Sequence, residues 1–87
     1  LLASYEAATA RWESLADRIE VFETRVVPSA EANVVATRQA YRNDVVPFDE
    51  LVSAEKALLR ARTRLLRLRT DRLLAQSDML YLAGERP

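Results

Sequence analysis

The sequence lacks the residues on which most enzyme sites and most stabilising cross-links of small domains depend. Its 87 residues include no Cys, no His and a single Gly, which excludes disulfides, the common zinc ligand sets and Gly-rich phosphate loops. No acid pair is placed as a catalytic site requires, and no carboxylates cluster as a metal site made of acids alone would need. We therefore expect no catalytic residue, cofactor or metal ligand, and predict that the chain is not an enzyme.

Long apolar runs are missing as well. No stretch approaches the roughly 20 apolar residues of a membrane-spanning helix, and no signal peptide opens the chain. A unit this short buries little surface by itself, so partner chains or the rest of a larger protein are expected to complete it. Because the chain begins Leu1-Leu2 without an initiator Met, we interpret it as a segment of a larger protein.

Apolar residues recur in alternating steps of four and three, the spacing of a coiled-coil seam. In the first half the seam comprises Leu1, Tyr5, Ala8, Trp12, Leu15, Ile19, Phe22 and Val26; past Pro28 it relaxes by one residue and continues through Ala30, Val34, Thr37 and Tyr41. In the second half it comprises Phe48, Leu51, Ala54, Leu58, Ala61, Leu65, Leu68, Arg72, Ala75, Met79 and Leu82. Gly84 suits the end of this second helix.

The two seams fit one another as the arms of an antiparallel hairpin, in which facing residues have numbers that add to a constant. Paired in order, they add to 90 or 91 before Pro28 and to 91 or 92 beyond it, so the fold point lies between residues 45 and 46. The predicted fold class is all-α, a long antiparallel two-helix coiled-coil hairpin. It comprises a helix over 1–43 that is kinked or broken near Pro28, a tip over 43–47 and a helix over 47–83.

A second apolar repeat lies one position round the second helix from the seam. Its members recur every seven residues: Val52, Leu59, Leu66, Leu73 and Leu80. Two helices that bury one seam cannot hide a second one, so further helices must cover it. For the hairpin in isolation we expect self-association, with two copies forming a four-helix bundle through this repeat.

Basic residues concentrate in the second helix. Between Lys56 and Arg72 there are seven basic residues and one acid, but they spread over five heptad positions and no aromatic lies among them, which disfavours nucleic-acid binding. Cross-helix pairing explains them better. The hairpin constant sets Glu31 level with Arg60, Glu23 level with Arg67 and Arg69, and Glu20 level with Arg72. Trp12 is expected to pack opposite Met79, and the seam residue Arg72 to reach an acid such as Glu20 or Asp17.

The order of motifs from Val26 to Gly84 resembles the C-terminal coiled-coil hairpin of outer-membrane efflux proteins, the TolC-like outer-membrane factors. That family shows a pattern close to L-P-x-A, a Tyr about ten residues on, a G-x-V-x-F tip, L-x-D-A-x-x-x-L and L-x-x-L-x-G. The corresponding stretches here are VVPSAEANVVATRQAYRNDVVPFDELVSAEKALLRA and MLYLAG. Departures from the pattern are Asp44 for the tip Gly, Val46 for the family's gating Arg, and Ser53 for the Asp of L-x-D-A.

The resemblance implies a role in transport. The segment would form part of the periplasmic α-barrel of a trimeric efflux channel in the outer membrane of a Gram-negative bacterium. Partners would be further copies of the protein, a periplasmic adaptor and an inner-membrane pump, with membrane contact only through other parts of the protein. The residues that the resemblance assigns to docking and gating at the tip are Tyr41, Asp44, Val45, Val46, Phe48 and Asp49.

Two alternatives stay open from the sequence. The segment Arg64–Leu68, RLLRL, with Leu74 further on, nearly matches the docking pattern of a membrane-fusion adaptor hairpin, although an adaptor carries that pattern at its tip. A generic dimerising coiled-coil module needs neither the tip Tyr41 nor Pro28. The transported substrate and the cognate pump are not encoded in any pattern of this segment.

Overall fold

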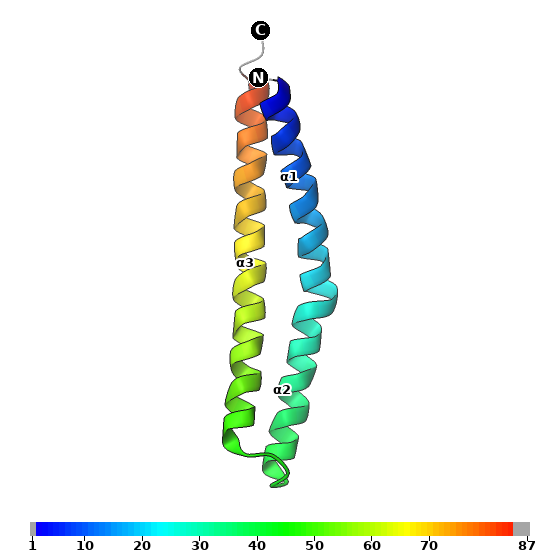
Figure 1. Ribbon diagram of the computed structural model, residues 1–87, viewed down its shortest axis with the longest axis vertical. Helices are drawn as coiled ribbons and strands as arrows, with labels where there is room; N and C mark the ends of the chain where they lie inside the picture. The colour runs from blue at the N-terminus through cyan, green and yellow to red at the C-terminus, as the bar shows by residue number, and fades with distance from the viewer. Residues whose placement is uncertain (1, 85–87) are drawn as a thin grey trace.

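The computed structural model describes residues 2–84 and is an all-α hairpin (Figure 1). The first arm is built from α1 (Leu2–Val21), a π-helical turn η1 (Phe22–Val26) and α2 (Val27–Arg42). The second arm is α3 (Phe48–Gly84). The molecule measures 68 × 16 × 13 Å, and both described ends lie opposite the connecting turn. The predicted all-α hairpin is therefore confirmed.

One apolar seam between the two arms forms the core. All ten buried residues of the described range 2–84 belong to the predicted seam: Ala8, Leu15, Ile19, Val34, Ala54, Leu58, Ala61, Leu65, Leu68 and Ala75. Leu68 and Ala75 are the most completely buried, with 1% and 0% of their surface exposed. Burying a Leu or Ile side chain contributes about 1.5–3 kcal/mol, so this row of contacts supplies most of what holds two long helices together.

The seam divides into two clusters on either side of η1. Leu15, Ile19, Leu65, Leu68 and Ala75 form the first cluster, and Val34, Ala54 and Leu58 form the second. The half-buried Val27 packs against both clusters. Because Val27 directly follows the π-helical turn, the junction of the two clusters coincides with the irregular part of the first arm.

The π-helical turn accounts for the one-residue drift of the seam. The Val27 N–H donates to the Phe22 carbonyl oxygen, five residues back instead of four, so the turn holds one residue more than an α-helical turn. Because of that extra residue, the residue numbers of facing pairs add to 90 or 91 before the turn and to 91 or 92 after it. The irregularity expected near Pro28 is thus a wider turn just before the proline, and the helix continues on both sides of it.

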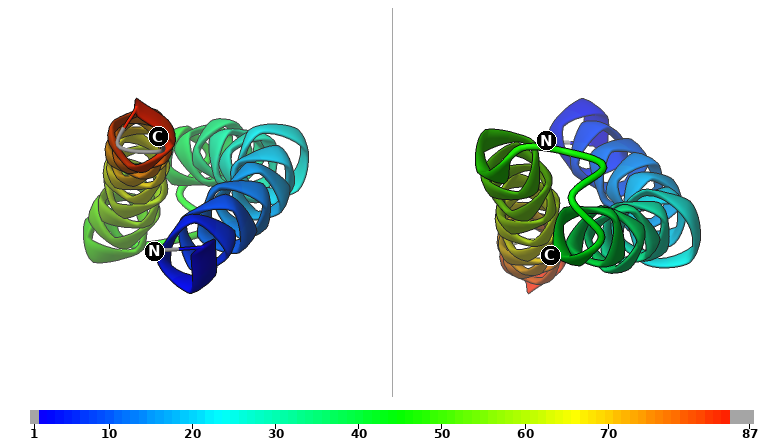
Figure 2. Two further views of the ribbon diagram at one scale, coloured as in Figure 1. Left: turned by 90° about the horizontal axis from the view of Figure 1, so that it is seen from above. Right: turned by 90° about the horizontal axis from the view of Figure 1, so that it is seen from below.

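The first arm bends at this turn, whereas α3 is nearly straight (Figures 1 and 2). Proline removes one helical hydrogen bond and crowds the carbonyl four residues before it, which is a recognised cause of kinks. The Thr24 hydroxyl also donates to the Glu20 carbonyl oxygen at 2.7 Å, an interaction that bends helices when it occurs inside them. Both causes act within one turn of the observed bend.

In the part of the chain that the structure describes, four ion pairs join the arms at exposed sites. They are Arg11–Asp78 at 2.8 Å, Arg38–Glu55 at 2.9 Å, Arg62–Glu31 at 3.1 Å and Arg69–Glu23 at 3.4 Å. The predicted pairing of Glu23 with Arg69 is confirmed, whereas Arg67, predicted at the same level, forms no ion pair within residues 2–84. Exposed pairs of this kind contribute at most about 1 kcal/mol each, so they set the alignment of the arms more than their stability.

Two charge predictions were wrong in their partners. Glu31 pairs with Arg62 and not with Arg60, because Glu31 follows a seam residue and its partner must also follow one, as Arg62 follows Ala61. Arg72 does not pair with Glu20 or Asp17; its guanidinium lies over the ring of Trp12, 4.2 Å from the centroid. A cation on an aromatic face is the favourable arrangement for a charge held on the seam itself.

Candidate docking site at the hairpin tip

The turn that closes the hairpin is a Schellman motif, a common way to end a helix. The Val45 N–H donates to the Ala40 carbonyl oxygen at 2.9 Å, and the Asp44 N–H donates to that of Tyr41 at 3.1 Å. These bonds satisfy carbonyls that the end of α2 would otherwise leave unpaired. The motif needs one residue in the left-handed conformation, and Asp44 adopts it with φ of 59°. The tip is therefore a defined turn held by its own backbone.

Replacing Asp44 with Gly is expected to stabilise the hairpin by about 1 kcal/mol, because Gly adopts positive φ without the steric cost that a side chain carries. Asp44→Val should lose about 1–2 kcal/mol for the opposite reason. Urea unfolding followed by circular dichroism measures both. The matched control is Asn43→Gly, where φ is −93° and no strain is relieved; a gain there equal to that of Asp44→Gly would contradict the explanation.

The second helix begins directly after Pro47. The predicted helix over 47–83 included Pro47 in its first turn, but α3 begins one residue later, at Phe48, and Pro47 lies just outside it. The Pro47 carbonyl oxygen accepts the Glu50 N–H at 3.1 Å. Asp49 and Glu50 occupy the first turn, where the helix dipole favours negative charge. Asp49 is exposed, so its carboxylate is presented to solvent at the tip.

Two aromatic rings meet across the turn. The Tyr41 and Phe48 rings are tilted at 57° with centroids 5.6 Å apart, a favourable aromatic geometry. Both were expected on the seam, but Tyr41 is 40% and Phe48 60% exposed, because no further helical turn lies beyond them to cover the rings. Val45 beside them is 73% exposed. The structure thus brings together an apolar surface at the end of the rod.

All six tip residues assigned by the resemblance lie within this turn or its flanking helix ends. Five of them are exposed, namely Tyr41, Asp44, Val45, Phe48 and Asp49, and Val46 is half-buried. A shallow groove that the sequence reasoning did not include runs from Phe48 along α3 to Leu59 and Arg62. The signal that points to it is the seven-residue spacing of Val52 and Leu59, which leads from the tip into the second apolar repeat.

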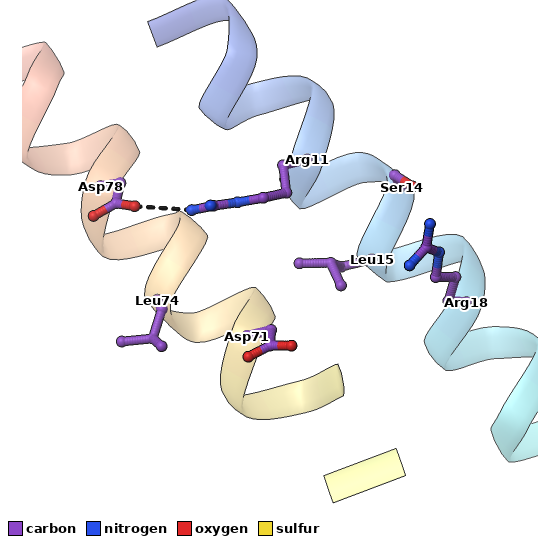
Figure 3. A pocket seen from close by; sticks show the side chains of 7 residues that line it. All are labelled: Arg11, Ser14, Leu15, Arg18, Asp71, Leu74 and Asp78. Atoms are coloured by element: carbon purple, nitrogen blue, oxygen red, sulfur yellow. Dashed lines mark hydrogen bonds and ion pairs between the residues drawn. The ribbon is translucent and has the colours of Figure 1, made fainter. Parts of the chain in front are cut away.

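The half of the hairpin far from the tip carries a hollow between the arms that is lined by both charged and apolar side chains. Arg11 of α1 and Asp78 of α3 point toward each other across it, and Leu15, Leu74 and Arg18 also line it (Figure 3). Over residues 2–84, no group of three or more acids is placed to hold a metal ion. None of the helices in that range is long and apolar enough to cross a membrane.

Comparison with known proteins gives no assignment. No protein-family model matches the chain, and neither a curated protein nor a solved structure does so significantly.

Proposed function

We propose that the chain is a non-enzymatic structural and docking element that packs laterally against further helices and meets its partner by the hairpin tip. Its specific form would be part of the periplasmic α-barrel of a trimeric outer-membrane efflux channel, with the tip docking the periplasmic adaptor and pump and gating the duct. The observation that carries the proposal is a rod with two unfinished surfaces: an exposed apolar tip on a fixed turn, and an uncovered leucine repeat along α3.

The tip supports docking because it is both apolar and preorganised. Hydrogen bonds from Asp44 and Val45 fix the turn, so binding there would cost little conformational entropy. Tyr41 and Phe48 contact each other and keep much of their surface exposed, and aromatic side chains are favoured anchors at interfaces. In this proposal Asp49 adds a negative charge that orients the partner.

The adaptor alternative is less well supported. Its docking pattern in this chain would be RLLRL, but Leu65 and Leu68 of that segment are buried in the core, 8% and 1% exposed. A partner reaches neither side chain without opening the hairpin. The generic coiled-coil alternative accounts for the leucine repeat of α3 but assigns no purpose to the exposed aromatic pair at the tip.

Tip variants in the full-length protein test the proposal. Asp49→Lys reverses the exposed charge and Asp44→Trp adds bulk at the turn; each is expected to reduce tolerance of exported compounds severalfold while the amount of channel in the membrane stays unchanged. The control Asp17→Lys makes the same charge change at an exposed residue of α1. Normal tolerance in both tip variants, with channel present at its usual level, would refute the docking role.

A further inference from the structure

The leucines of the second apolar repeat are exposed to solvent along one face of α3. Leu59, Leu66, Leu73 and Leu80 are 63–67% exposed, and at 1.5 Å per residue they span about 32 Å. Thr70 lies beside this row, and its hydroxyl donates to the Leu66 carbonyl oxygen at 3.0 Å. A partner that covers the row therefore does not need to supply an acceptor for this hydroxyl. A continuous apolar surface of this length on a solvent-exposed face marks an interaction site. We name these four leucines the leucine stripe.

The leucine stripe is bordered by positive charge that the hairpin does not neutralise. Of the seven basic residues from Lys56 to Arg72, Arg62 and Arg69 pair with acids of the first arm and Arg72 lies on Trp12. The other four form no ion pair within residues 2–84: Lys56, Arg60, Arg64 and Arg67. Arg60 and Arg67 directly follow Leu59 and Leu66 and lie about 100° further round α3. They are on the flank of the stripe opposite to Arg62 and Arg69, which pair with the first arm.

We infer that the leucine stripe binds an amphipathic helix that carries an apolar residue at every seventh position and acidic residues along the flank facing Arg60 and Arg67. The inference rests on the lateral packing in the proposed function and adds the chemistry of the neighbour. Apolar contacts supply most of the affinity in such helix pairs, and the flanking charges select the partner. The free guanidinium groups of Arg60 and Arg67 make acids the matching choice.

A second copy of the chain is a poorer occupant than such a helix. Stripe against stripe would set two basic segments over each other, which is unfavourable at short range. The first arm of a second copy offers the matching sign through Glu6, Glu13 and Glu20, which recur every seven residues. That row holds no leucines, however. Neither of these two surfaces of a second copy combines apolar and acidic rows. The four-helix bundle of two copies that the sequence predicts is therefore the weaker mode of association through the stripe.

Binding of two synthetic helices to the 87-residue chain tests the inference. Both probes carry Leu at every seventh position; one has Glu along its flanks and the other has Lys. By fluorescence anisotropy of labelled probes, the Glu helix should bind at least about tenfold more tightly in low salt, and the difference should shrink at roughly 0.5 M salt, where screening acts within a few ångströms. Leu66→Lys should abolish binding of the Glu helix.

Charge-swap variants make the test specific. Arg60→Glu with Arg67→Glu changes two residues that form no ion pair within residues 2–84 and should reverse the preference toward the Lys helix. Arg18→Glu with Arg25→Glu alters the net charge equally on the first arm, where both side chains are exposed, and should leave the preference for the Glu helix in place. Equal binding of the two probes, or exclusion of both by a hairpin dimer, would overturn the inference. Tip variants test the efflux role by a separate readout, so the two proposals can fail independently.

Discussion

Leu68→Ala is expected to lower the free energy of unfolding of the hairpin by about 2–5 kcal/mol, the range for truncating a buried leucine. Leu68 is 1% exposed and lies in the larger of the two core clusters, with Leu15, Ile19 and Leu65 around it. Two paired helices have no third element that can move in to fill the cavity, so little of the loss is recovered by relaxation. Urea unfolding followed by helical circular dichroism gives the change.

Leu66 provides a matched control for this experiment in the same helix. It is also a leucine, two residues earlier, but 63% exposed, so Leu66→Ala should change the free energy of unfolding by less than about 0.5 kcal/mol. Trp12 packs against the cluster that contains Leu68 and reports on the same transition by fluorescence. A loss at Leu66 as large as that at Leu68 would mean that the seam does not hold the arms together.

The sequence alone determined the core of this molecule because a coiled coil repeats one geometric rule along its whole length. Each of the ten buried residues in the described range 2–84 was predicted from spacing, and the constant sum of facing residues located the fold point between residues 45 and 46, inside the segment that joins α2 to α3. The predictions were wrong at the ends of the repeat and where the side of the helix on which a residue lies decides its partner. Tyr41 and Phe48 satisfy the spacing but lie past the last helical turn that could cover them. Arg60 and Arg62 are both close to the height of Glu31 along the rod, but only Arg62 lies on the side of α3 that faces it.

The position of the candidate site in the chain was predictable from the sequence, but the exposure of its side chains was not. The break in helix formers located the tip, whereas the exposed fractions of its side chains depend on how α2 and α3 end in space. The Schellman turn exposes Val45 and leaves Val46 half-buried, and no pattern of letters distinguishes those two valines. Pro28 shows the same limit: a proline and a one-residue drift indicate an irregularity, and a break, a kink or a π-helical turn would each satisfy them.

Deleting Arg25 from the π-helical turn is expected to destabilise the hairpin by about 3 kcal/mol when Pro28 is present and by little when Pro28 is replaced with Ala. Arg25 is exposed and forms no ion pair within the described part of the chain. Its removal takes out the one extra residue and restores an unbroken heptad spacing from Phe22 onward. The turn then becomes α-helical, and the proline ring meets the carbonyl four residues before it.

The four chains of this cycle separate the two roles of the turn, which are to absorb the extra residue and to accommodate the proline. Pro28→Ala alone should change stability by less than about 1 kcal/mol, since the wider turn already relieves the clash, and the double variant should match or exceed the parent; the coupling energy would then be about 3 kcal/mol. The control is deletion of Asn33, an exposed residue in the regular part of α2. This deletion shifts the apolar residues on one side of it out of alignment with the seam of α3. Pro28→Ala should not rescue that loss. Additive effects of the Arg25 deletion and Pro28→Ala would show that the π-helical turn exists independently of the proline.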